Sequence, residues 1–115
     1  MGIQFFQRGD GLVPPNEMQT IVYIPLDTVA VGGAVYTVPA DKKLYVHAIS
    51  WVGSTNDDIK IWDTTTVYLF SKNNLASFAF VGGAILNVIP AGTILTMNST
   101  NAGQTVSGFI SGWLQ

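Results

Sequence analysis

Short runs rich in Val, Ile, Thr, Tyr and Phe follow one another along the chain, and Gly, Pro or Asn interrupts them about every 8 to 12 residues. No stretch of a dozen residues keeps the 3.6-residue period of an amphipathic helix. Runs of this kind predict β-strands. The strands that we expect lie at Thr20–Ile24, Ala34–Val38, Lys43–Val52, Ile59–Trp62, Thr66–Phe70, Ala76–Val81, Ala84–Val88, Ile94–Met97 and Thr105–Leu114.

These strands predict one all-β domain. Parallel sheets need crossover segments of a dozen or more residues, usually helices, and the sequence offers none. Many short segments with regular turn signals are typical of a two-sheet sandwich. We therefore expect an antiparallel β-sandwich, jelly-roll-like, with about eight or nine short strands over residues 19–115.

The first 18 residues predict an extended N-terminal arm, because they contain Pro14-Pro15 and lack clean alternation of apolar and polar residues. Burial of Phe5 and Phe6 is worth about 1.5 to 3 kcal/mol each, so an arm that carries both should dock somewhere. It packs either along its own domain or against a neighbouring subunit. Its tripeptide Arg8-Gly9-Asp10 matches the sequence that integrins bind, and it is also ordinary loop chemistry.

One short motif occurs twice. Val31-Gly32-Gly33-Ala34-Val35 is matched by Val81-Gly82-Gly83-Ala84-Ile85, and a Pro-Ala pair follows each copy, at Pro39-Ala40 and Pro90-Ala91. Gly-Gly permits the positive φ of a tight turn, and proline ends a strand ladder. The motif indicates either two similar halves of a sandwich or two unrelated hairpins that happen to contain the same turn residues.

Several predicted strands are apolar on both faces. Alternation in residues 43–52 places Leu44 and Val46 on one side and Tyr45 and Trp51 on the other. A free antiparallel sandwich exposes one polar face per strand, so a second apolar face indicates cover by a loop, the arm or another chain. We therefore expect oligomerisation. The residues that we expect at the interface are Phe5, Phe6, Tyr45, His47, Trp51, Tyr68, Phe70 and Trp113.

The last predicted strand, residues 105–114, contains two glycines on one face. Gly108 and Gly112 share that face with Ile110, whereas Phe109 and Trp113 lie on the other. Glycine inside a strand indicates a bend or the close approach of another backbone.

Charged residues make up 10% of the chain, against about 25% in a typical soluble domain. They cluster in predicted turns, and the stretch Leu44–Val52 carries none. This pattern favours uncharged sheet faces that neighbouring subunits cover. Five basic residues against seven acidic ones argue against electrostatic binding of nucleic acid. No apolar run approaches the 18 residues of a membrane-spanning helix.

Few residues are available for catalysis: one His, one Arg, one Glu and no Cys. A Ser-His-Asp triad would have to use His47, which lies in the middle of a predicted strand. We expect no enzymatic activity, no catalytic residues and no cofactor. Asn56-Asp57-Asp58 and Asp63 could supply oxygen ligands to Ca²⁺, but the same residues are ordinary in β-turns, and we expect no metal site.

Trp62 leaves a ligand-binding surface open. It alternates with Ile59 and Ile61, which places it on the face of Lys60, where an indole could stack on a sugar ring. The alternative is that the aromatic residues fill core or interface, where they are enriched.

Three segments together resemble a protein family. Tyr36–Val46 (YTVPADKKLYV), Ile89–Leu95 (IPAGTIL) and Val106–Leu114 (VSGFISGWL) resemble the pattern of small β-sandwich structural proteins of tailed and other bacteriophages. That family includes capsid decoration or cement proteins, head fibres and tail-associated proteins. The resemblance covers roughly residues 35–114 and leaves the arm outside it.

The resemblance implies a non-enzymatic virion protein. We expect a homo-oligomer, a trimer or a pentamer, that docks on a major capsid or tail protein as a decoration or minor capsid protein. The alternative is a carbohydrate- or receptor-binding module on the same scaffold, such as a spike or fibre head, with a glycan as its ligand. The resemblance supplies no catalytic residues.

Overall fold

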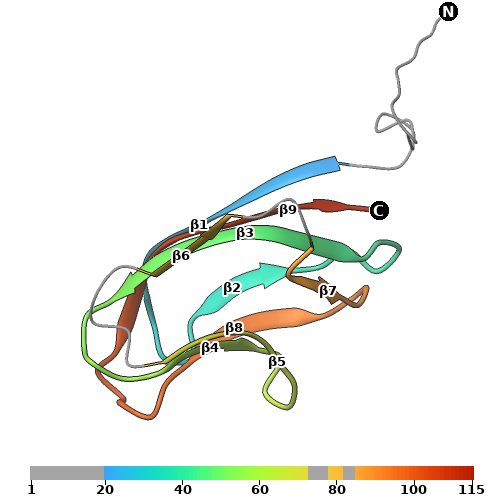
Figure 1. Cartoon of the computed structure of the whole chain (residues 1–115). Coiled ribbons are helices and arrows are strands. Elements are labelled where there is room, and N and C mark those ends of the chain that lie inside the picture. The colour runs from blue at the N-terminus through green and yellow to red at the C-terminus, as the bar shows by residue number, and fades with distance from the viewer. Residues whose placement is uncertain (1–19, 73–77, 82–84) are drawn as a thin grey trace, which may run out of the picture.

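A computed structural model of the chain describes residues 20–72, 78–81 and 85–115, and these residues form nine β-strands without any helix (Figure 1). The predicted arm at residues 1–18, with Phe5, Phe6 and the tripeptide Arg8-Gly9-Asp10, lies outside the described residues.

The strands form two antiparallel sheets. Sheet A has the order β1 (Thr20–Ala30), β9 (Thr105–Leu114), β3 (Leu44–Gly53) and β6 (Phe78–Val81), and β7 (Asn87–Ile89) pairs with another part of β3. Sheet B has the order β2 (Ala34–Thr37), β8 (Ile94–Asn98), β4 (Ile59–Trp62) and β5 (Val67–Ser71). In Figure 1, β1, β3, β6 and β9 lie in one layer above β2, β4, β5 and β8.

The pairing of the strands is nested. β1 pairs with β9, β2 with β8, β3 with β6 and β7, and β4 with β5. This describes one long antiparallel hairpin whose tip is the connection between β4 and β5. Because β3 also pairs with β9 and β4 with β8, the hairpin is wound into two sheets. Such winding is the topology of a jelly roll, so the predicted all-β, jelly-roll-like sandwich is confirmed.

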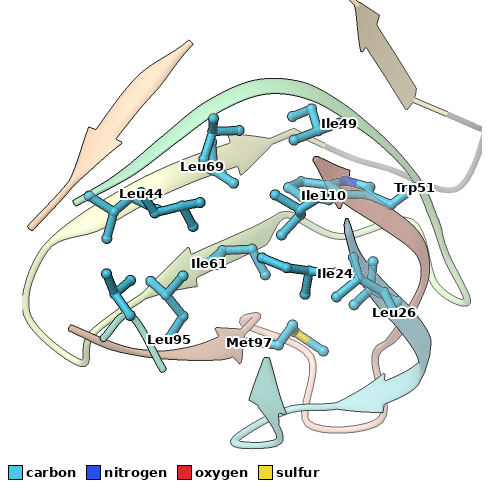
Figure 2. Close-up of a cluster of buried hydrophobic side chains, with 14 of the residues drawn as sticks. Ile24, Leu26, Leu44, Ile49, Trp51, Ile61, Leu69, Leu95, Met97 and Ile110 are labelled. Carbon is cyan, nitrogen blue, oxygen red and sulfur yellow. The ribbon is translucent and has the colours of Figure 1, made fainter. Parts of the chain in front are cut away.

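The hydrophobic core lies between the two sheets. β4 shows how the sequence builds it, because Ile59 and Ile61 are fully buried while Lys60 and Trp62 between and after them point outward. Leu44 of β3 and Leu95 of β8 are equally buried. Figure 2 shows side chains of both sheets meeting in this layer: Ile24, Leu26, Leu44, Ile49, Trp51, Ile61, Leu69, Leu95, Met97 and Ile110.

β1 is longer than the sequence predicts. The predicted strand ends at Ile24, before Pro25, whereas the ladder with β9 continues through Pro25, which lies opposite Phe109. Proline is tolerated at this position because β1 is an edge strand, so a missing N–H on its free side breaks no ladder bond. The strand predicted at Ala84–Val88 is likewise shifted, to Asn87–Ile89.

A β-bulge in β3 reverses the predicted faces of half of that strand. Val46 lies opposite Gly112 and Ala48 opposite Ser111, so His47 is an extra residue without its own partner on β9. Beyond the bulge, Trp51 therefore points inward and is 1% exposed. The prediction that Trp51 lies at a subunit interface is wrong, because this side chain belongs to the core of its own chain. Its Nε1 donates a hydrogen bond to Ser71 Oγ at 2.7 Å.

The two Pro-Ala corners lie against each other. In each corner a backbone N–H donates to the proline carbonyl three residues earlier, from Lys42 to Pro39 at 3.4 Å and from Thr93 to Pro90 at 3.3 Å. Between the corners, the N–H of Val38 donates to the carbonyl of Thr93 at 2.9 Å. Since β2 pairs with β8 and β3 with β7, the two copies run antiparallel to each other. This arrangement favours the interpretation that the repeat marks two similar halves of the sandwich.

Candidate functional site: the outer face of sheet A

The outward side of sheet A is a continuous surface to which β1, β3, β7 and β9 contribute. Its residues alternate with core residues of the same strands, so they point away from sheet B. We call the following residues the outer face of sheet A: Ile21, Tyr23, Pro25, Tyr45, His47, Ser50, Val52, Val88, Phe109, Ser111 and Trp113.

The strand register sets these side chains in rows. Ile21 of β1 lies opposite Trp113 of β9, Trp113 lies opposite Tyr45 of β3, and Tyr45 lies opposite Val88 of β7. Ile21 is 74% exposed, although an isolated isoleucine of this exposure would be unremarkable by itself. In a row with three further apolar side chains, it becomes part of a patch that crosses the whole sheet.

Aromatic rings contact one another along this face. The rings of Tyr45 and Trp113 stack with centroids 5.7 Å apart, and those of Tyr23 and Phe109 stack with centroids 5.4 Å apart. The imidazole of His47 lies 5.7 Å from the Trp113 ring at an angle of 39°. These neighbours hold one another in place, so the patch is presented as a fixed surface.

The outer face of sheet A carries no Lys, Arg, Asp or Glu among its described residues. Charged residues flank it instead, with Lys43 immediately before β3 and Asp27 beyond Pro25 in β1. His47 is the face's basic side chain, and the distance from its Nε2 to Ser111 Oγ is 3.4 Å. The face can therefore bury apolar area, but it offers no charge with which to bind an ionic ligand.

Two glycines set the spacing of the strands beneath this face. A Cβ added at Gly108 would meet the backbone of Ser50 and Trp51, and one added at Gly112 would meet the carbonyl oxygen of Tyr45. The predicted close approach of another backbone is confirmed at both positions. At Gly112 it fixes the distance between β9 and β3, and hence the stacking of Tyr45 on Trp113.

The structure brings together three of the residues that the sequence predicts at an interface, namely Tyr45, His47 and Trp113. Phe70 is 45% exposed but belongs to β5 of the opposite sheet. Tyr68 is half-buried against the core. The predicted set therefore does not form a single surface.

Sequence reasoning missed Ile21, Tyr23 and Val88, which complete the outer face of sheet A. The alternation of Ile21, Tyr23 and Pro25 with Val22, Ile24 and Leu26 was the signal that could have found them, since both sets are apolar.

The outward face of sheet B differs in chemistry. Trp62 is half-buried there, as its alternation with Ile59 and Ile61 predicts, and it lies opposite Thr96 of β8. Lys60 lies in the next outward position, opposite Asn98. On the side of β5 the outward neighbours are apolar instead, since Val67 lies opposite Trp62 and Phe70 opposite Lys60, and both are exposed.

The acidic residues considered for Ca²⁺ serve as turn residues. Asp63 Oδ1 accepts hydrogen bonds from the backbone N–H groups of Thr66 at 2.6 Å and Thr65 at 2.9 Å. The bond from Thr66, followed by that from Thr65, lowers the pKa of Asp63. In the described ranges, no group of three or more His, Asp or Glu side chains is gathered as a metal site would require.

The loop around Asp57 depends on a buried residue that the sequence does not single out. Gln104 is fully buried, and its Nε2 donates to the carbonyl oxygens of Thr55 at 3.0 Å and Asp57 at 3.2 Å. Its Oε1 accepts from the N–H of Thr55 at 2.8 Å. The Gln104 amide thus satisfies backbone groups of the loop that a neighbouring strand would otherwise bind, and it holds the loop in place at this end of the sandwich.

No helix among the described residues is long and apolar enough to cross a membrane. No protein-family model, no curated protein and no solved structure matches this chain.

Proposed function

We propose that the protein is a non-enzymatic structural subunit of a virion, which self-associates and docks on a phage capsid or tail surface as a decoration or minor capsid protein. The observation that carries this proposal is the aromatic, uncharged outer face of sheet A. Large exposed apolar patches on soluble proteins mark interaction sites. The jelly-roll topology and the resemblance of Tyr36–Val46 to phage structural proteins give the proposal its virion setting.

A second copy of the chain is the occupant that suits this face best. Identical charged patches would repel each other, whereas a face without Lys, Arg, Asp or Glu meets its own copy without repulsion. β1, β3 and β9, which are ten or eleven residues long and about 4.8 Å apart, cover roughly 480 Å² of flat area, and the three residues of β7 add to it. This is more than half of the roughly 800 Å² per partner of a standard stable interface. A contact between the same face of two copies is two-fold, so by itself it joins two subunits and does not give the expected three or five copies. It leaves other surfaces for the capsid or tail.

Two exposed isoleucines on opposite sheets allow a matched test of the contact. Ile21 is 74% exposed on the outer face of sheet A, and Ile94 is 61% exposed on sheet B. Ile21→Lys places a charge in the proposed contact and should raise the dissociation constant of self-association at least tenfold in sedimentation equilibrium. Ile94→Lys should leave it within about twofold.

The same measurement gives the number of copies from the mass. A wild-type chain that stays monomeric at high micromolar concentration would overturn self-association. If both variants weakened self-association equally, the contact would not lie on the outer face of sheet A. Docking is tested separately, by sedimentation of virions from an infected culture. The protein should travel with the particles, and its recovery in the soluble fraction alone would contradict the virion role.

A specific observation also favours a second candidate function, the binding of a carbohydrate on sheet B. Trp62 is half-exposed opposite Thr96, and the next outward pair on these strands is Lys60 and Asn98. An aromatic ring flanked by such groups suits a sugar ring. Binding on a glycan array that disappears in Trp62→Ala and persists in Trp113→Ala would support this function.

A further inference from the structure

His47 lies near the middle of the outer face of sheet A, at the bulge where β3 changes faces. It is the single histidine of the chain. Its imidazole is half-buried and lies tilted against the Trp113 ring, with the ring centroids 5.7 Å apart. Its Nε2 lies 3.4 Å from Ser111 Oγ. Histidine is the side chain whose charge changes between about pH 5 and pH 8. A proton added there converts an uncharged face into a charged one.

None of the three strands that pair with β3, which are β6, β7 and β9, brings a compensating charge. β9 contains no titratable side chain, and neither do residues 78–89, which include β6 and β7. On β3 itself the titratable neighbour is the phenol of Tyr45, and Lys43 precedes the strand. On β1 the groups are the phenol of Tyr23 and, near the far end, the carboxylate of Asp27. Among the described residues, the strands that pair with β3 therefore offer no carboxylate to a positive charge that a second copy covers.

We propose that self-association through the outer face of sheet A requires uncharged His47, so that acidification separates the copies. The inference rests on the proposed function, because it needs a contact that covers this face. Covering a group with apolar surface disfavours its charged form. The assembled state then binds fewer protons than the free subunits, and linkage makes association weaker as the pH falls. For each histidine that the contact covers, the dissociation constant can change by at most about tenfold per pH unit.

Sedimentation equilibrium of the full chain at pH 7.0 and pH 5.5 tests this directly. The ratio of the two dissociation constants should be at least three for the wild type and close to one for His47→Gln. Comparing ratios within each protein removes any effect of the substitution on affinity at neutral pH. His47→Gln keeps every carboxylate, so it also controls for their titration. Circular dichroism at both pH values establishes that the strands persist.

A second readout follows the proton itself. Because the chain has one histidine, one set of imidazole signals in the NMR spectrum reports on His47. The midpoint of its titration should lie at lower pH in a concentrated, assembled sample than in a dilute one. An unchanged midpoint in samples shown to differ in assembly would overturn the inference.

The remaining outcomes separate the two proposals. If the wild type assembles with the same affinity at both pH values, the histidine inference fails and the proposed self-association stands. If wild type and His47→Gln weaken equally in acid, the proton binds elsewhere and the inference also fails. If no assembly occurs at either pH, the proposed self-association fails together with the inference that rests on it.

Discussion

The ring of Tyr45 on β3 stacks in parallel on the ring of Trp113 on β9, with the two planes only 2° apart. Such a pair contributes about 0.5 to 1.5 kcal/mol beyond the area that it buries. A double-mutant cycle of Tyr45→Leu and Trp113→Leu should therefore give a coupling of about that size in the free energy of unfolding. Urea denaturation at a concentration where the chain is monomeric measures it.

The matched control cycle combines Tyr45→Leu with Trp62→Leu. These residues belong to opposite sheets, so their effects should add within about 0.5 kcal/mol. Coupling as strong in the control as in the stacked pair would show that the measured term does not come from ring contact.

Gly112 is a position where one added methyl group should destabilise the fold. Its Cβ would collide with the carbonyl oxygen of Tyr45, so Gly112→Ala must push β9 away from β3. Overpacking of this kind costs typically about 1 to 3 kcal/mol, which should lower the melting temperature by several degrees. Gly103→Ala is the control, since its Cβ would lie 3.4 Å from the Asn101 side chain, and its effect should stay within about 0.5 kcal/mol. If Gly112→Ala and Gly103→Ala lost similar amounts of stability, the collision at Gly112 would not be the cause.

Gln104 should be essential to the loop that it holds. Gln104→Met keeps the size of the side chain but leaves the N–H of Thr55 and two carbonyl groups without this partner. Each buried group left unpaired costs about 1 to 3 kcal/mol, so guanidinium denaturation should show a loss of at least that size. Asn56→Ala changes an exposed residue of the same loop and should have a small effect. A stable Gln104→Met protein would show that water replaces the amide.

Asp63 should make stability depend on pH in the acidic range. Hydrogen bonds from Thr66 and Thr65 lower the pKa of its carboxyl below the ordinary value of 3.8. A group with a lowered pKa in the folded state stabilises the fold above its unfolded pKa, and this contribution is lost as the pH falls through its folded pKa. The free energy by which the wild type is more stable than Asp63→Asn should therefore be constant above about pH 5. It should decrease as the pH falls below about 4.

Thermal unfolding of both proteins from pH 7 to pH 2.5 tests the role of Asp63. If the melting temperatures of the two proteins differed by the same amount at every pH, a role of Asp63 in the pH dependence would be excluded. Asp41→Asn, at an exposed aspartate, is measured alongside as the control for the loss of one negative charge.

The sequence was sufficient for the fold class because turn residues and β-branched runs are local signals. It was insufficient for β3, where both faces are apolar: alternation then gives the same pattern whichever way the strand faces. The bulge at His47 adds a single residue, which changes the face of Trp51 without leaving a mark in composition. Which face is inward beyond that point is decided by pairing with Ser111 and Gly108, more than fifty residues away.

The candidate site was predictable in part for the same reason. The sequence groups Tyr45 and Trp113 as interface residues, and the structure places both on the outward face, each where its strand keeps regular alternation. Ile21 and Tyr23 could be assigned to the same surface only once β1 was known to pair with β9. A surface assembled from both ends of the chain depends on long-range register, which no local window of sequence contains.

The pairing of Thr20 with Leu114 also governs the order in which the chain can fold during synthesis. The ribosome makes β1 among the first strands and β9 as the last of the nine, so β1 has no partner until nearly all of the strands have emerged. The β4–β5 hairpin can form much earlier, since its strands are close in sequence. An eleven-residue, largely apolar strand thus stays unpaired through most of translation, and during this interval its free edge exposes the newborn chain to aggregation.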